Sequence, residues 1–215
     1  MLRNSTRNAM RNAVSLVAGL VLAAGLAGCR VHVDKGSNGE EKDVQVDTPF
    51  GGIHVNTDQT TAADLGLPVY PGAQIVKDDN DKSADVHMGF GEWQLRVKVV
   101  NYTTPDDKDK VIAFYKKALG RFGDVISCQN DSPVGTPTST AEGLTCAEDA
   151  HAHVNVNSDG HNYGYHGSSG FELKAGSKRH QHILGLESSG PGQTRFSLVA
   201  LDLPIGSDTD AGKSD

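Results

Sequence analysis

Histidine is the residue type whose spacing in this sequence most readily suggests chemistry. The chain contains nine histidines, and two segments carry a His-x-His pair, His151 with His153 and His180 with His182. On a strand, residues i and i+2 project from the same face, so each pair would present two imidazoles together. On neighbouring strands the β-carbons of opposed residues lie about 4.5–5.5 Å apart. Four imidazoles so placed could hold Zn²⁺, Cu²⁺ or Ni²⁺.

The same alternation is also typical of a sheet with one solvent-exposed face. In the first segment Ala152 and Val154 alternate with the histidines. The core would then use only the apolar side chains, and the histidines would lie on the solvent-exposed face. The second pair has the same parity as Leu184 and Leu186, which favours partly buried, hydrogen-bonded histidines. No carboxylate stands at a recognised metal-ligand spacing. The metal site and the exposed sheet face both stay open as interpretations.

Catalytic motifs are weaker than the histidine pairs. Ser168 and Ser169 follow His166 in HGSSG, but a serine nucleophile needs a positioned base, and the G-x-S-x-G elbow is absent from this segment. We therefore expect a non-catalytic protein without an organic cofactor. Tyr163 and Tyr165, in HNYGYHG, could contact a glycan or another envelope protein, or could pack within a loop. The sequence does not indicate an oligomeric state.

The first 28 residues have the composition of an export signal. They carry Arg3, Arg7 and Arg11 and no acidic residue, and positions 14–26 are apolar or small apart from Ser15. This apolar segment has the length of a secretory signal and is shorter than the about 20 residues that a membrane-spanning helix needs. The sequence thus predicts a signal peptide over residues 1–28.

The end of that segment, LAGC, resembles the lipobox of bacterial lipoproteins. The resemblance implies that the Cys29 thiol receives a diacylglyceryl group, that residues 1–28 are removed and that the new amino terminus is acylated. Two or more acyl chains would hold the protein stably on a membrane, whereas one binds reversibly. The alternative is a plain secretory signal with an incidental cysteine. Arg30, which replaces the aspartate of inner-membrane lipoproteins, favours the outer membrane of the cell envelope, facing the periplasm.

Two further segments, DLGLPVYPGA and KVIAFYKKALGRFG, are similar to a pattern in uncharacterised exported lipoproteins of soil bacteria. The TPFGG and LKAGSKRHQHI stretches resemble the same group, so the likeness covers most of residues 44–203. It implies an exported location and a single domain. It implies no activity, substrate or catalytic residue.

The charge of the chain excludes one large class of partners. The chain has 20 basic and 27 acidic residues, and loss of the three arginines of the signal peptide leaves 17 against 27, a formal charge of −10. Nucleic-acid binding needs clustered Lys and Arg, so we expect no nucleic-acid partner. Anionic lipid would not attract this chain either, so the membrane contact is expected to depend on Cys29.

Cys128 and Cys146 are the two cysteines that lipidation would leave. An even number of cysteines in an exported chain predicts a disulfide between them. A two-cysteine metal site is the alternative, but the chain has no CxxC spacing. A disulfide closing a loop of roughly 15–20 residues would stabilise the fold by about 3 kcal/mol.

The remaining sequence predicts the elements that must position these groups. Residues 29–43 are polar and predict a flexible tether. Alternating valine and isoleucine around TPFGG predict a hairpin over residues 44–57, either separate or the first part of a single domain over residues 44–203. The polar residues 204–215 predict a disordered tail.

One strong amphipathic helix is predicted over about residues 105–122. Thr104 is its expected N-cap and Pro105 its first residue, while Val111, Tyr115 and Leu119 form an apolar stripe. About six to eight strands accompany this helix. The sequence therefore predicts the α+β class, a mostly antiparallel sheet with the main helix packed on one face.

Overall fold

The computed structural model describes residues 29–35, 41–57, 59–76, 83–147, 154–158, 161–165, 170–187 and 192–204. The strands are β1 (Arg30–Lys35), β2 (Glu41–Thr48), β3 (Gly51–Thr57), β4 (Gln74–Ile75), β5 (Ala84–Phe90), β6 (Trp93–Thr104), β7 (Val125–Gln129), β8 (Ser132–Pro133), β9 (Val154–Ser158), β10 (His161–Tyr165), β11 (Phe171–Gly176), β12 (His180–Leu186) and β13 (Thr194–Asp202). The helices are η1 (Ala62–Leu65), α2 (Lys108–Leu119) and η2 (Gly120–Phe122).

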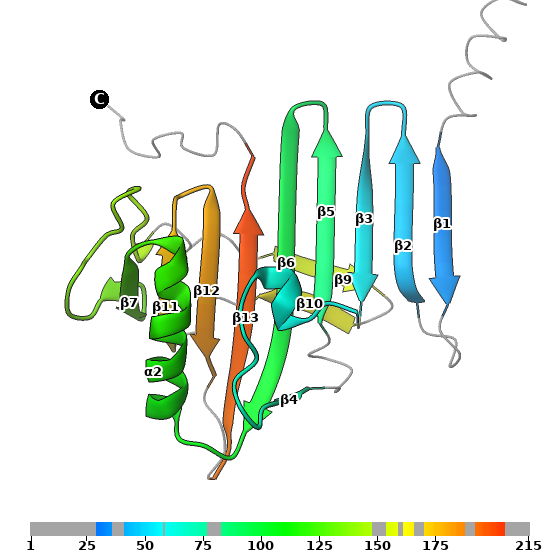
Figure 1. Cartoon of the computed structure of the whole chain (residues 1–215). Coiled ribbons are helices and arrows are strands. Elements are labelled where there is room, and N and C mark those ends of the chain that lie inside the picture. The colour runs from blue at the N-terminus through cyan, green and yellow to red at the C-terminus, as the bar shows by residue number, and fades with distance from the viewer. Residues whose placement is uncertain are drawn as a thin grey trace, which may run out of the picture.

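One large sheet dominates the described part of the molecule. Its strands follow the order β1-β2-β3-β5-β6-β13-β12-β11-β7-β8, with β4 also paired to β6, and every pairing is antiparallel. Strands β9 and β10 form a separate two-stranded sheet. Figure 1 shows β1 at one end of the large sheet and α2 in front of β11 near the other end. The mostly antiparallel sheet with one main helix agrees with the predicted class in broad terms, but the described part of the chain is more sheet-dominated than a balanced α+β fold and has more strands than expected.

The amino-terminal segment differs from the prediction of a tether. Residues 30–35 form β1 and pair along their length with β2, which starts at Glu41. Val31 and Val33 alternate with polar residues and lie opposite Val46 and Val44 of β2, so the apolar side chains of the two strands share one face of the sheet. The hairpin predicted over residues 44–57 corresponds to β2 and β3. Since β3 pairs with β5, this hairpin is part of the sheet.

Helix α2 begins three residues later than predicted. Its N-cap is Asp107, because β6 continues to Thr104, which pairs with Thr194 of β13. Thr104 instead accepts a hydrogen bond from the backbone N–H of Asp106 through its hydroxyl, at 3.3 Å. The helix then ends in η2, so the helical segment finishes at Phe122 as expected.

The main hydrophobic core lies between α2 and the sheet. The predicted stripe of Val111, Tyr115 and Leu119 is fully buried against apolar side chains of β11, β12 and β13. The Tyr115 hydroxyl also donates to the Pro68 carbonyl at 3.1 Å and accepts from the Tyr70 backbone N–H at 3.2 Å. The helix is thereby attached both to the sheet and to the segment that precedes β4.

The opposite face of the sheet carries two smaller buried clusters. One joins β6, β13 and β12 through Val97, Val99, Ile183, Val199 and Leu201. The other surrounds the cysteine pair and contains Ile126, Cys128, Leu144 and Cys146. Of the predicted disordered tail, residues 205–215 lie outside the described residues.

Candidate functional site

The four histidines of the predicted metal site are only partly described. His151 and His153 lie outside the described residues. His180 is exposed, and its Nδ1 lies 2.9 Å from an Asp202 carboxylate oxygen on the neighbouring strand β13. A histidine with a carboxylate partner in a directly opposed position is a cross-strand pair that stabilises a sheet.

His182 is in a different environment from His180. Its ring stacks on Phe122 of η2, with the ring centroids 3.6 Å apart and the planes 8° from parallel. Burial lowers the pKa of His182 below its ordinary value of 6.5, although a nearby Asp202 carboxylate and a hydrogen bond to the Leu65 backbone oppose that shift. The prediction that this pair would be partly buried and hydrogen-bonded is therefore confirmed for His182.

The described residues do not assemble a metal centre. No group of three or more His, Cys, Asp or Glu side chains that could hold an ion occurs among the residues that the structure describes. His180 and His182 are each engaged with a different neighbour. Ser168, Ser169 and His166, the serine–histidine combination of the sequence, lie outside the described residues.

A larger set of histidines is brought together by strand pairing. One residue from each of seven neighbouring strands falls in a single line across the sheet, and we name this line the histidine row. Consecutive members are directly opposed across β1, β2, β3, β5, β6, β13 and β12. The row consists of His32, Gln45, His54, His87, Arg96, Asp202 and His180.

The histidine row lies on the face of the sheet that also carries α2. His180 has the same parity as Leu184, which packs in the core beneath the helix. Six members of the row are exposed and Gln45 is half-buried. The core on this face extends to Val100 and Tyr102 of β6. Beyond it, the row continues the same face as a polar surface over the first part of β6 and over β5, β3, β2 and β1.

Polar side chains on neighbouring strands hold several members of the row in place. His54 Nε2 lies 3.0 Å from Asp43 on β2, and His87 Nε2 lies 3.0 Å from the Gln94 side chain on β6. Arg96 binds both oxygens of Asp85 on β5, through Nε at 3.0 Å and a second nitrogen at 2.6 Å. This two-point contact raises the pKa of Arg96. The polar groups are therefore oriented, although they are open to solvent.

Sequence reasoning missed the histidine row. The signal was present, since the segments VHV, IHV and VHM each place one histidine among apolar residues with strand periodicity. Their alignment depends on strand pairing and register, which a single sequence does not specify. Only His180 belongs to both the predicted site and the row.

Cys29, the predicted lipidation site, is exposed and carries a free thiol. It directly precedes Arg30, the first residue of β1. Figure 1 shows that β1 starts at the edge of the sheet where the β2–β3 and β5–β6 turns also lie. The register agrees, since Arg30 is in line with Asp47, Gly52, Gly89 and Gln94.

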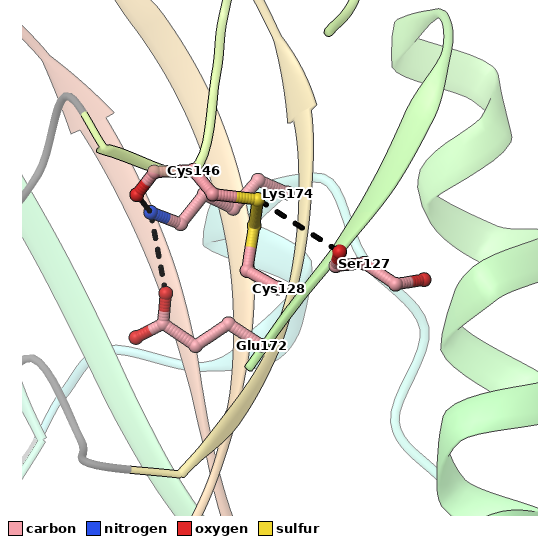
Figure 2. The surroundings of a disulfide bond; sticks show 5 residues. All are labelled: Ser127, Cys128, Cys146, Glu172 and Lys174. Atoms are coloured by element: carbon pink, nitrogen blue, oxygen red, sulfur yellow. Dashed lines mark hydrogen bonds and ion pairs between the residues drawn. A yellow bond between two sulfur atoms is a disulfide. The ribbon is translucent and has the colours of Figure 1, made fainter. Parts of the chain in front are cut away.

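The predicted disulfide between Cys128 and Cys146 is confirmed. The two Cα atoms lie 5.6 Å apart, and the bond ties β7 to the end of the segment after β8. Figure 2 shows Lys174 of β11 beside it. The fully buried Lys174 places its Nζ 3.2 Å from Glu172 and donates to the Cys146 carbonyl at 3.4 Å. These contacts make the disulfide part of a buried polar cluster.

A cleft of about 750 Å³ lies where α2 begins. Its lining includes Asp106, Lys110 and Glu187. Lys110 binds Asp106 at 2.7 Å, and the Tyr70 hydroxyl donates to the same carboxylate at 2.9 Å. Lys110 and Tyr70 together hold the pKa of Asp106 below its usual range. Asp106 and Lys110 are thus paired with each other at the wall of this cleft.

Comparison with protein-family models, curated proteins and solved structures gives no match to this chain. The resemblance to exported lipoproteins therefore rests on the quoted motifs and stays a prediction. Among the described residues no helix is both long enough and apolar enough to cross a bilayer.

Proposed function

We propose that this chain is a lipid-anchored protein of the bacterial cell envelope with a non-catalytic binding or scaffolding role. Its anchor is Cys29, and its binding surface is the histidine row. The observation that carries the binding role is the row itself, because it gathers hydrogen-bonding side chains from seven strands into one line, and six of the seven are exposed. An open polar sheet face of this kind suits an extended partner such as a glycan or a segment of another envelope protein.

The anchor is supported by the LAGC motif and by the position of Cys29. The cysteine is exposed at the start of the edge strand β1, where a modifying enzyme can reach the thiol. Acyl chains on that sulfur would leave the pairing of β1 with β2 unchanged, because the first paired residue is Arg30. Fractionation of cells that express wild-type protein or the Cys29→Ser variant tests the anchor. We expect wild type in the membrane fraction and the variant in the soluble fraction.

The binding surface is tested by photo-crosslinking in living cells. A photoreactive amino acid at Gln45, inside the row, should give discrete adducts that the double variant His54→Ser, His87→Ser loses. The same probe at Lys117, an exposed position on α2, is the matched control. Equal adducts at both positions, or adducts that persist in the double variant, would contradict the assignment of the row as the binding surface.

A further inference from the structure

The end of the sheet next to Cys29 carries an unusual amount of exposed apolar surface. Nine large hydrophobic side chains are exposed in the described part of the chain, and five of them lie at this end. We name these five the apolar tip: Val31 (66% exposed), Phe50 (84%), Ile53 (36%), Phe90 (47%) and Trp93 (40%). Scattered exposed hydrophobic residues are ordinary on a protein surface, whereas a contiguous group marks an interaction site.

Strand pairing makes the tip contiguous. Val31 and Ile53 both lie opposite Val46, and Ile53 continues to Met88 and Leu95. Phe90 is paired with Trp93 across the β5–β6 turn, with their ring centroids 6.0 Å apart. Phe50 lies in the neighbouring β2–β3 turn. These turns and the start of β1 form the same edge of the sheet (Figure 1).

The chain itself indicates what meets the tip. The apolar segment of residues 14–26 joins the described chain at Cys29, two residues before Val31. Acyl chains on Cys29 would bring this edge to a bilayer. Aromatic side chains are enriched where proteins meet the boundary between headgroups and acyl chains. Because the chain is acidic, anionic lipid would not attract it. Apolar contact is therefore the interaction that can hold this edge on a lipid surface.

We propose that the apolar tip docks on the lipid surface and fixes the orientation of the domain on the membrane. This inference rests on the proposed anchor. Phe50, Phe90 and Trp93 insert at the headgroup level, the strands run away from the membrane, and the histidine row is presented beside it. The tip thus contacts a lipid surface. Because the contact is apolar, neutral lipid is sufficient for docking.

Trp93 is the single tryptophan of the chain, so its fluorescence reports the tip alone. Full-length protein purified from bacterial membranes is reconstituted into neutral phosphatidylcholine vesicles, and floated vesicles are collected. In the floated protein we expect a blue-shifted Trp93 emission, quenching by brominated phosphatidylcholine and protection from aqueous iodide. Phe50→Ser should lower the ratio of docked to undocked protein by about tenfold, the loss expected for one inserted phenyl ring.

Two matched controls accompany Phe50→Ser. Val134→Ser and Val69→Ser replace side chains that are 51% and 49% exposed, away from the tip, and should leave the quenching unchanged. Phe50 is so exposed that its replacement should not affect folding. Phe90→Ser is a second tip variant, and circular dichroism verifies that each variant is folded.

Failure of the tip and failure of the anchor give different results. Protein that floats with vesicles while Trp93 stays open to iodide retains the anchor and overturns the docking. Protein that does not float overturns both proposals. Trp93 emission that is already blue-shifted before vesicles are added, together with a dimer in light scattering, would assign the tip to a second copy of the chain and would also overturn the docking.

Discussion

At the residue scale, a buried ion pair is an energetically costly feature of this fold. Lys174 is fully buried and Glu172 is 5% exposed, and together they lie beside the disulfide on the face opposite α2. Removing ions from water is unfavourable, so such a pair contributes little net stability. Loss of one partner is nevertheless strongly destabilising, because the other charge stays buried. The pair and the Cys146 carbonyl together specify how the segment after β8 lies on the sheet (Figure 2).

Replacing Lys174 alone should therefore destabilise the protein strongly. We expect Lys174→Met to lower the free energy of unfolding by about 3–5 kcal/mol, because the buried Glu172 carboxylate would lose the ammonium group 3.2 Å away. Urea unfolding followed by circular dichroism measures this change. The double variant Lys174→Met, Glu172→Leu is the control and should recover most of the loss. A double variant that is no more stable than the single one would contradict the explanation.

His182 gives the stability of the fold a pH dependence. Its pKa is lowered in the folded protein, mainly by burial, so the unfolded chain binds a proton more readily. Stability should be complete above the ordinary pKa of 6.5 and should fall as the pH decreases below it. Urea midpoints at about pH 7.5 and about pH 5.5 should differ more in wild type than in His182→Gln. Equal differences would show that this histidine does not contribute.

At the element scale, patterns within one segment were predicted correctly and relations between segments were not. The stripe of α2 follows from spacing within one segment, the disulfide follows from the two cysteines that lipidation would leave, and both occur. The start of α2 was placed too early because Thr104 and Pro105 have the pattern of a helix start, whereas pairing with β13 keeps Thr104 in β6. The histidine row was missed because it depends on six strand pairings at once. Strand β1 was missed because only two valines indicate it.

A second prediction at the element scale concerns the segment that the disulfide joins to β7. Little secondary structure holds residues 134–146, where Thr140 donates to the Gly176 carbonyl at 2.9 Å. Replacing both Cys128 and Cys146 by serine should lower the free energy of unfolding by about 3 kcal/mol through the loop entropy of the unfolded chain. Limited proteolysis should then cut first within this segment. Wild-type stability in the double variant would contradict a structural role for the disulfide.

At the scale of the whole molecule, the sheet between β1 and β6 has two chemically different faces. One carries the histidine row, and the other carries the valines and aromatic rings that reach the apolar tip. The row lies two residues further along the strands than the edge at Arg30, about 7 Å at the rise of an extended chain. A domain docked by its tip would therefore hold the row close to the membrane, within reach of partners in the same envelope layer.

The central claim is that lipid on Cys29 places this domain in the cell envelope. Mass spectrometry of the amino-terminal peptide, from protein purified out of its native membranes, tests that claim most directly. The account predicts a peptide that begins at Cys29 and carries the mass of a diacylglyceryl group and an amide-linked acyl chain. A peptide that still contains residues 1–28, or that begins with an unmodified Cys29, would contradict it.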